Sequence, residues 1–531
     1  METWNRWIAS AILAMGTILP SSAQELATIP LPPMGWSSWN SFSNTVNSAN
    51  VVEQAKAIHE SELQKAGYVY VNIDEGWWLG DRDQQGNIVV DAKSWPAIEP
   101  GERDGDMSNI VRYIHSLGLK AGIYTDAGKD GCSTYPDIGP AYFHTGSEGH
   151  YEEDFLRFAE WGFDYVKVDW CGGYKENLDP AVQYAEIARA IARAEAKTGH
   201  KLYYSICDWG KQSPSTWGAG IGGASQAIWR TGGDIVAPVV VGGPHTERKA
   251  SFEAMLRNFD ANYHPEAEHT GFYNDPDMMV LGMPGLNASE NKLHMSLWAM
   301  AAAPLLIGAD VTKLDANTLA DFTNSDVIAI DQDAAGLQAV KVGENGPGLE
   351  IWSKFLARSG ERAVLLLNRT YFPAPMHMDW KDLGLSGDHA EVKDVWSGDP
   401  AVAVNGHYEA TVPAHDGILL RIKSSEAPVV KHYTPVSQSN RMSGAETHFV
   451  HLAQTGSGWS QIKISYRNAS PQGAVVDLHT NDHGGTRVAM PPTGNATRSV
   501  WIQVQLDQPG NENRMVFSNS GRASILSLDV Y

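Results

Sequence analysis

The stretch DYVKVD (residues 164–169) decides the fold. It is a short, largely apolar run with the length and composition of a buried β-strand, and it ends on the charged residue Asp169. Farther along, Asp179-Pro180 opens a segment whose apolar residues recur at helical spacing until Gly199. The stretch therefore predicts one buried strand that is followed by one helix.

The same unit recurs from Pro32 to about residue 325. Eight apolar runs can be counted: MGWSSWN (34–40), YVYVNID (68–74), KAGIYTD (120–126), DYVKVD (164–169), LYYSIC (202–207), AIWRTG (227–232), NDPDMMV (274–280) and PLLIGAD (304–310). Continuous apolar strands that alternate with helices indicate a parallel sheet covered on both faces. We therefore predict an α/β fold, a (β/α)8 TIM barrel, over residues 24–327.

The rest of the chain lacks helical periodicity and contains runs typical of strands, such as GLEIWSKF (348–355), RAVLLLNRT (362–370) and RSVWIQVQLD (498–507). We predict a small antiparallel β-sandwich domain over 328–425 and a C-terminal jelly-roll β-sandwich over 426–531. The polar stretch 424–440 is expected to link them.

Charge and the first residues limit the partners and the location. The chain of 531 residues has a formal net charge of -22 and no Lys/Arg-rich run, which argues against nucleic acid and anionic membranes as partners. Arg6, the apolar stretch 7–19 and the small residues before Gln24 form the pattern of a signal peptide over 1–23. We expect a secreted or periplasmic protein. A membrane anchor is disfavoured because the apolar stretch is shorter than the roughly 20 residues of a span.

The three cysteines match no zinc motif, and we predict no metal site. Cys132 and Cys171 each follow the end of a predicted strand, so they could meet at one mouth of the barrel and form a disulfide, leaving Cys207 buried. The alternative is three inert buried thiols.

Polar side chains gather at the carboxyl ends of the predicted strands. They are Asp74, Glu75, Asp126, Lys167, Asp169, Asp208, Arg230, Asp234, Asp275 and Asp277. Any one of the aspartates could simply cap the next helix. Together they predict an acidic pocket at the end of the barrel where active sites lie. Glycoside cleavage requires a pair of carboxyl groups, which aspartates at different strand ends can provide.

Seven ordered motifs resemble those of the melibiase (α-galactosidase) family of retaining glycosidases: PPMGWSSWNSF (32–42), YVNIDEGWW (70–78), GIYTDAG (122–128), DYVKVDWC (164–171), WRTGGDI (229–235), YNDPDMM (273–279) and APLLIGADV (303–311). The resemblance covers the whole barrel. It implies Asp169 as the nucleophile and Asp234 as the acid/base, without a cofactor. It also implies substrate-binding roles, and the predicted ligands are Trp36, Asp74, Glu75, Tyr124, Lys167, Asp208, Arg230 and Asp277.

The resemblance predicts hydrolysis of terminal α-D-galactosyl residues from a carbohydrate. Three departures from the common pattern are Glu75 where an Asp is usual, Trp170 where an Asn is usual, and Asp208 where a Glu is frequent. A longer carboxylate at Glu75 could crowd a hydroxymethyl group, so a β-L-arabinopyranosidase is the alternative. More remote rivals are a non-catalytic lectin and a metal-dependent hydrolase, although no HExxH-type ligand set occurs. Residues 513–531 resemble the last strands of a jelly-roll carbohydrate-binding module. Sugar binding by residues 426–531 and mere packing are equally compatible with the sequence.

Overall fold

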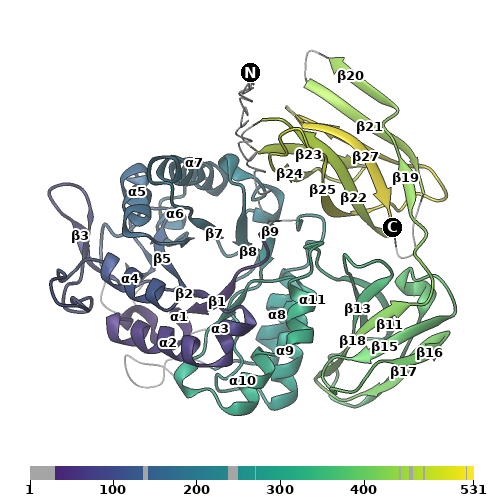
Figure 1. Ribbon diagram of the computed structural model, residues 1–531, viewed down its shortest axis with the longest axis horizontal. Coiled ribbons are helices and arrows are strands. Elements are labelled where there is room, and N and C mark those ends of the chain that lie inside the picture. Colours follow the sequence, from purple (N-terminus) through teal and green to yellow (C-terminus); the bar gives the residue numbers. More distant parts are fainter. Residues whose placement is uncertain are drawn as a thin grey trace, which may run out of the picture.

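The computed structural model describes residues 30–134, 142–236, 249–269, 271–441, 444–453, 458–470, 473–521 and 523–531. The predicted signal peptide (1–23) lies outside these ranges. A barrel of strands and helices is followed by two all-β regions (Figure 1). Among the described helices, none has the length and apolar character needed to cross a membrane.

The barrel is built on one parallel sheet of eight strands in the order β10-β1-β2-β5-β6-β7-β8-β9. In chain order these strands are β1 (Met34–Ser37), β2 (Tyr70–Asn72), β5 (Lys120–Asp126), β6 (Tyr165–Asp169), β7 (Tyr203–Cys207), β8 (Ala227–Arg230), β9 (Phe272–Asp275) and β10 (Leu305–Ile307). A parallel bridge between Met279 and Ile307 joins the segment after β9 to β10 and closes the ring. The predicted (β/α)8 barrel is confirmed.

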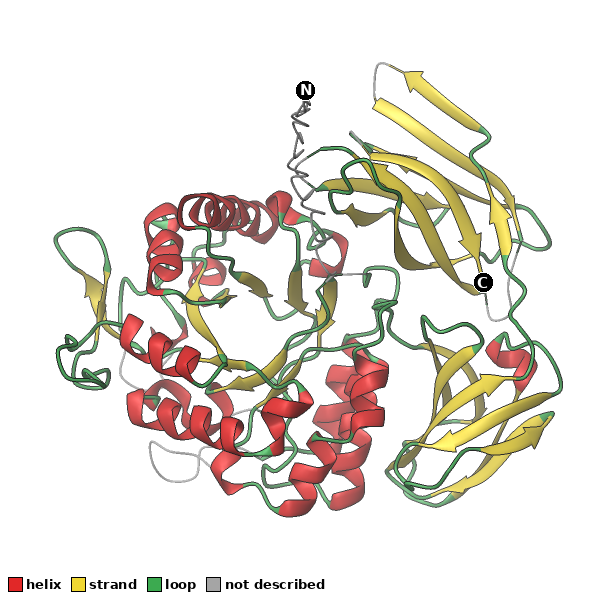
Figure 2. Cartoon of the chain, in the orientation of Figure 1, coloured by secondary structure: helices red, strands yellow, loops and turns green. Residues whose placement is uncertain are grey.

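Helices surround the sheet (Figure 2). They are α1 (Trp39–Phe42), α2 (Ser48–Glu60), α3 (Glu62–Ala66), α4 (Ser108–Ser116), α5 (Tyr151–Trp161), α6 (Cys171–Lys175), α7 (Pro180–Thr198), α8 (Phe252–Ala261), α9 (Ala288–Met300), α10 (Ala316–Phe322) and α11 (Ser325–Asp331). A hairpin of β3 (Trp78–Arg82) and β4 (Ile88–Val90) projects from the loop after β2. Asp179 caps α7 by accepting a hydrogen bond from the Val182 amide, with Pro180 in the first turn, as the sequence predicts.

One strand lies earlier than predicted. The seventh run was expected at 274–280, but β9 covers Phe272–Asp275. Pro276 has no amide hydrogen to donate, and Asp277 adopts a left-handed φ of 90°, so the chain turns out of the sheet directly after Asp275. The turn places Asp277 beyond the strand end, where its carboxylate can face neighbouring loops.

The first β region has a six-stranded antiparallel sheet, β11-β12-β13-β18-β15-β16, and the pair β14-β17. Its strands are β11 (Val340–Gly346), β12 (Leu349–Phe355), β13 (Glu361–Asn368), β14 (Ala374–Asp379), β15 (His389–Asp394), β16 (Val402–Asn405), β17 (His407–Val412) and β18 (Asp416–Ser424). Alternating apolar residues of the sheet and the pair meet in one core.

The C-terminal region is a second sandwich, with sheets β19-β27-β22-β25 and β20-β21-β26-β23-β24. Its strands are β19 (Lys431–Tyr433), β20 (Ser437–Arg441), β21 (Gly444–Leu452), β22 (Trp459–Asn468), β23 (Ala474–Thr480), β24 (Thr486–Met490), β25 (Arg498–Gln505), β26 (Asn513–Ser518) and β27 (Ala523–Val530). Thus the stretch 424–440 is not a plain linker, because it contains β19 and most of β20. Because this stretch is polar, it lacks the alternating apolar residues by which a strand is recognised in a sequence.

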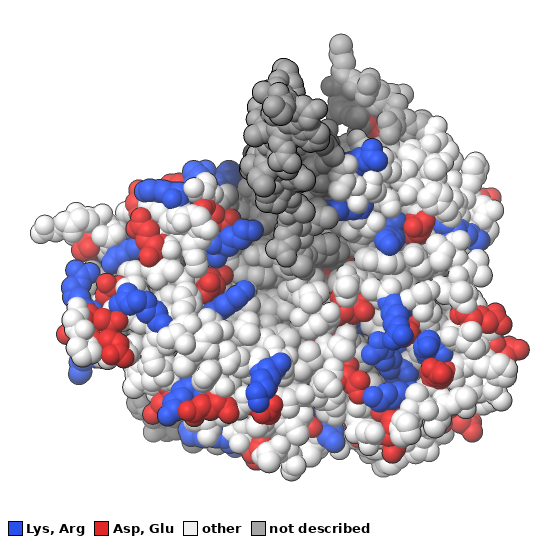
Figure 3. Space-filling view, in the orientation of Figure 1, with Lys and Arg blue, Asp and Glu red and all other residues white. Residues whose placement is uncertain are grey.

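Charged side chains are mixed over the molecular surface. On the face shown in Figure 3, Lys and Arg are interspersed with Asp and Glu. One ion pair joins two domains: Arg369, which follows β13, contacts both carboxylate oxygens of Asp260 in α8, at 2.9 and 2.7 Å. Such bidentate pairing fixes orientation as well as distance.

Candidate active site

Strand β6 carries the centre of the candidate site. Lys167 and Asp169 are two residues apart, so their side chains leave the same face of the strand. The Lys167 ammonium lies 2.8 Å from Oδ2 of Asp74, which follows β2, and 3.9 Å from Oδ2 of Asp169. It also lies over the Tyr124 ring, 5.3 Å from the centroid. One partly buried cation therefore lies between two carboxylates from different strand ends.

The surroundings of Asp169 favour a buried, ionised carboxylate. Its side chain is only 7% exposed, and Oδ1 accepts a hydrogen bond of 2.9 Å from the Trp170 amide. Burial raises the pKa of Asp169 to about 6, an effect that Lys167 opposes and that the charges of Asp74 and Asp234 reinforce. At neutral pH the carboxylate is thus largely ionised, and it is poorly solvated, as a nucleophile should be.

A second cluster surrounds Arg230 at the end of β8. This buried guanidinium lies 3.1 Å from Oδ1 of Asp277 and 3.3 Å from Oδ1 of Asp234. The Asp234 side chain is 45% exposed, in contrast to Asp169. Its carbonyl is held by Arg257, which donates a 2.9 Å hydrogen bond. Asp234 can therefore reach solvent while its backbone stays fixed.

Asp277 is firmly anchored. Its carboxylate accepts hydrogen bonds of 2.8 Å from the amides of Ile235 and Met278, and its own amide donates to Asp275. The left-handed backbone of Asp277 is strained for a residue with a side chain, and such strain is typical of functional sites. The interactions hold Arg230 and the loop that carries Asp234 in a fixed relation.

Asp208 follows β7 and is fully buried. Its Oδ1 accepts a long hydrogen bond of 3.2 Å from Gly210, and Oδ2 has no hydrogen-bond partner among the described residues. Burial raises the pKa of Asp208 to about 8, although nearby Arg230 opposes the effect. A buried carboxyl oxygen without a partner beside Arg230 is suited to receive a ligand hydroxyl.

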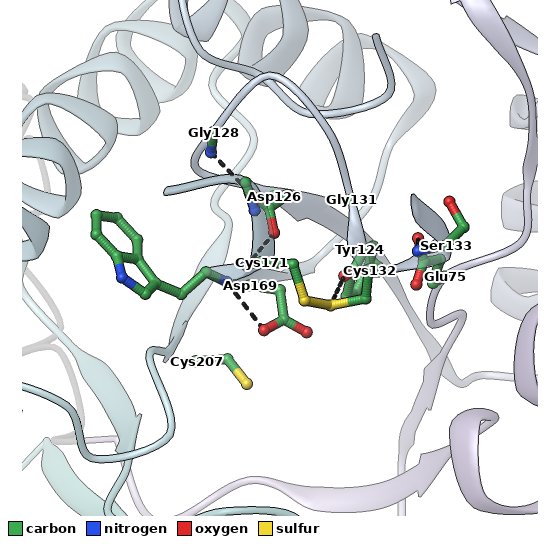
Figure 4. The surroundings of a disulfide bond; sticks show 12 residues. Glu75, Tyr124, Asp126, Gly128, Gly131, Cys132, Ser133, Asp169, Cys171 and Cys207 are labelled. Atoms are coloured by element: carbon green, nitrogen blue, oxygen red, sulfur yellow. Dashed lines mark hydrogen bonds between the residues drawn. A yellow bond between two sulfur atoms is a disulfide. The ribbon is translucent and has the colours of Figure 1, made fainter. Parts of the chain in front are cut away.

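Glu75 points to a different place from its neighbour Asp74. Its Oε1 accepts a 2.8 Å hydrogen bond from the Ser133 amide, and Figure 4 shows the two residues side by side. Burial raises the pKa of Glu75 to about 8, and Oε2 is unpaired within the described parts of the chain. A Cβ at Gly131 would lie 2.7 Å from Oε1, so glycine makes room for the longer side chain. Glu75 thus packs against the loop after β5.

That loop is fixed by a disulfide. Cys132 and Cys171 are bonded, with their Cα atoms 5.1 Å apart, and Cys207 is a buried free thiol (Figure 4). Asp126 stabilises the same corner, because its carboxylate accepts hydrogen bonds from the amides of Gly128, Cys171 and Gly172. The pairing is the one that the positions of the cysteines suggested.

These atoms do not form a metal site. One donor atom each of Asp126, Cys132, Asp169 and Cys171 lies within 4.8 Å of the others. Both sulfur atoms are used in the disulfide, however, and neither can act as a thiolate ligand. The Asp126 oxygens already accept three backbone hydrogen bonds.

Loss of this disulfide should destabilise the protein strongly. The bridge closes a segment of 39 residues, and the entropy of that loop in the unfolded chain corresponds to about 4 kcal/mol. We expect the Cys132→Ala/Cys171→Ala double variant to lose stability on this scale in urea unfolding, with Cys207→Ala as the control that keeps the bridge. Equal unfolding midpoints for the wild type and the double variant would contradict the assignment.

The aromatic residues near the strand ends are all buried, with exposed fractions of 0 to 1%. Trp36 is fully buried and donates its indole N–H to the Ala309 carbonyl at 3.0 Å. Tyr124 is buried over Lys167, and Trp77 and Trp78 are core residues. Trp77 and Trp78 pack edge-to-face against each other, which assigns both to the barrel core.

Sequence reasoning missed two positioning residues. Ser133 determines the direction of Glu75 through its amide, for which the sequence offers no signal. Asp275 was counted in the predicted acidic pocket but was given no role, and it accepts a hydrogen bond from the Asp277 amide. The Asp-Pro-Asp spacing could have indicated this turn.

Comparisons with known proteins agree with this geometry. A family model described as "Alpha galactosidase A" matches residues 31–333, and one described as "Alpha galactosidase C-terminal beta sandwich domain" matches 346–422. A Dictyostelium discoideum protein named "Probable alpha-galactosidase" is 34% identical over 421 residues, covering 78% of this chain and 98% of that protein.

Solved structures share the fold. α-Galactosidase I from Mortierella vinacea superposes with a TM-score of 0.63 at 28% identity, covering 75% of this chain and 98% of that one. A β-L-arabinopyranosidase from Geobacillus stearothermophilus shares the fold at 21% identity, with a TM-score of 0.61 and coverage of 74% and 97%. The family models and the identity to a full-length relative show that this chain belongs to the α-galactosidase (melibiase) family of glycoside hydrolases.

Proposed function

We propose that the protein is a retaining exo-glycosidase that removes terminal α-D-galactosyl residues from a carbohydrate, with Asp169 as nucleophile and Asp234 as acid/base. The observation that carries the proposal is the contrast between the two carboxylates. Asp169 is buried beside Lys167, whereas Asp234 is half-exposed beside Arg230. A double displacement needs one carboxylate that attacks the anomeric carbon and another that gives and takes a proton. The contrast suits Asp169 to the first role and Asp234 to the second.

In the first step Asp169 attacks the anomeric carbon, the glycosidic bond breaks, and the departing oxygen takes a proton from Asp234. In the second step Asp234 takes a proton from water, the water oxygen attacks the anomeric carbon, and the bond to Asp169 breaks. Two inversions give net retention. The half-exposed position of Asp234 suits a group that must meet both the leaving group and water.

The sugar would be held by the polar groups around the two carboxylates. Asp74 and Lys167 can bind hydroxyls on one side, and Arg230 and Asp208 on the other. Trp36 and Tyr124 are buried in this structure, so a role of their rings in stacking on the sugar stays a prediction of the resemblance. Asp277 would act partly through Arg230, because most of its bonds are internal. The names of the relatives support galactose as the sugar that this pocket takes.

Paired substrates test the identity of the sugar. We expect kcat/KM on nitrophenyl α-D-galactoside to exceed that on nitrophenyl β-L-arabinopyranoside, which differs by lacking the hydroxymethyl group. Glu75 was the reason to consider the pentose, but its Oε1 is engaged by Ser133. Glu75→Asp should therefore change the ratio of the two constants less than about tenfold. A wild type that prefers the pentose would overturn the assignment to galactose.

Lys167 should control the acidic limb of the pH profile. The pKa of Asp169 is raised by burial and held down by the Lys167 charge, so removing that charge raises it further. Because the nucleophile must be ionised, activity is lost as the pH falls through this pKa, near 6 in the wild type. We expect Lys167→Met to move the acidic limb of kcat/KM upward by about one pH unit or more, and Lys167→Arg to leave it in place. An acidic limb at the same pH in Lys167→Met and the wild type would contradict this effect of the Lys167 charge on the pKa of Asp169.

We also propose that the protein is exported, because the barrel mouth contains a disulfide and disulfides persist in oxidising compartments. Amino-terminal sequencing of the protein from its native source should then begin at Gln24. A chain that still begins at Met1 would contradict export through a cleaved signal peptide.

A further inference from the structure

The barrel lacks an α-helix between β7 and β8. Residues 208–226 are all described, and they form only two short 3₁₀ turns, η3 (Pro214–Thr216) and η4 (Ile221–Gly223). A Cβ at Gly218 would lie 2.6 Å from the Trp229 ring, and one at Gly222 would lie 2.3 Å from the Ala185 carbonyl of α7. This segment, which we call the β7–β8 loop, thus packs closely against the barrel at two of its glycines.

The C-terminal sandwich covers this loop. Arg487 of β24 donates a 2.8 Å hydrogen bond to the Trp217 carbonyl, and a Cβ at Gly220 would lie 2.2 Å from the Val475 side chain of β23. Figure 1 shows β23 and β24 on the side of the barrel near β8 and β9. The sandwich therefore takes the place of the absent helix.

The contact continues beside the loop. The Thr486 hydroxyl donates to the Glu266 carbonyl, and the Ala489 amide donates to Nε2 of buried His269, both at 3.0 Å. Burial lowers the pKa of His269 to about 4, so its ring is neutral and Nε2 can accept. Strand β24 is thus held to the barrel by three hydrogen bonds, which is unlike a module on a free tether.

From the loop, a row of aromatic rings leads to the nucleophile. The Trp217 ring stacks on Tyr184 of α7 with centroids 5.9 Å apart, and Tyr184 packs on Trp170 at 5.4 Å. The Tyr184 hydroxyl donates a 3.1 Å hydrogen bond to the Val168 carbonyl. Val168 and Trp170 flank Asp169, and the Trp170 amide donates to its carboxylate. The row therefore ends on both neighbours of the proposed nucleophile.

We propose that the C-terminal sandwich is an internal brace for the nucleophile strand, and that Arg487 is a positioning residue that acts through Trp217 and Tyr184. The sandwich lies outside both family models, whose matches end at residues 333 and 422. Its role is to replace a missing layer of the barrel and to keep β6 and the start of α6 in register for attack. The kinetic part of the test rests on the proposed hydrolysis of galactosides.

The test compares Arg487→Ala with Arg487→Lys, which keeps a donor, and with Arg514→Ala. Arg514 lies in the same sandwich, and within the described part of the chain its side chain forms an ion pair with exposed Asp482 and none with the barrel. With active sites counted by titration, we expect Arg487→Ala to lower kcat about tenfold with KM changed less than twofold. Arg487→Lys should recover most of the rate, and Arg514→Ala should match the wild type. An unchanged kcat in Arg487→Ala would overturn the proposal.

A second measurement does not depend on turnover. Hydrogen exchange of the peptide over residues 165–175 should be faster in Arg487→Ala than in the wild type or Arg514→Ala, because the support of β6 and α6 is weakened. Equal exchange rates in Arg487→Ala and the wild type would overturn the proposed bracing role, even if the protein hydrolysed no galactoside. If Arg487→Ala does not fold, Tyr184→Phe, which removes only the bond to Val168, should lower kcat severalfold at unchanged KM, and an unchanged kcat there would also count against the brace.

Discussion

Replacement of Asp169 by alanine is expected to reduce kcat on nitrophenyl α-D-galactoside by roughly 10⁴-fold or more, because no other group can form the glycosyl-enzyme. The shortened side chain leaves space beside Lys167 for a small anion. Azide entering there would attack the anomeric carbon once, so the expected product is the β-galactosyl azide, which proton NMR identifies.

The control for this variant is an aspartate far from the site. Asp482 lies in the C-terminal sandwich with a side chain that is 92% exposed, and Asp482→Ala should keep the wild-type rate and give no azide product. Substantial turnover by Asp169→Ala without azide would show that the nucleophile lies elsewhere.

Asp234→Ala is expected to lose roughly 10² to 10⁴ of kcat, the range that general acid/base catalysis contributes. The loss should be smaller for substrates with good leaving groups, because these need less protonation in the first step. The glycosyl-enzyme then accumulates, since no base activates water. Azide needs no base, so it should restore turnover and yield the α-galactosyl azide.

The opposite configurations of the two azide products separate the roles of Asp169 and Asp234. The same product from both variants, or rescue of neither, would contradict the division of work that the structure suggests between the buried and the half-exposed carboxylate. This comparison needs no knowledge of the natural glycan.

The barrel was predictable because its signal is local and repeated. In DYVKVD and several of the similar runs, an apolar strand ends in a polar residue, and a parallel sheet collects those ends at one edge. This pattern predicts that Asp74, Lys167 and Asp169 are neighbours, and the structure places them in one ion-paired group.

The direction of individual side chains was less predictable. Glu75 and Asp74 are adjacent in sequence, yet one packs on the loop after β5 and the other binds Lys167. What separates them is a backbone amide at Ser133 and the space left by Gly131, both about sixty residues away. The alternation of apolar and polar residues along a strand carries no information about contacts with residues so far away in the sequence.

The contacts of the C-terminal sandwich were also beyond the sequence. Arg487 bonds to Trp217 across 270 residues, and neither residue belongs to a motif. A single polar hydrogen bond between distant strands and loops leaves no periodic trace. The sequence therefore did not distinguish sugar binding by the sandwich from mere packing. The observed contacts between the sandwich and the barrel favour a structural role.

The most direct test of the account is to trap the covalent intermediate. A fluorinated galactosyl fluoride that forms the glycosyl-enzyme quickly and hydrolyses slowly should inactivate the protein with a stoichiometry of one. Mass spectrometry of the digested protein should then show the sugar on the peptide that contains Asp169, and Asp169→Ala should remain unlabelled. A label on a different carboxylate, or inactivation without a covalent adduct, would contradict the assignment of Asp169 as the nucleophile of a retaining galactosidase.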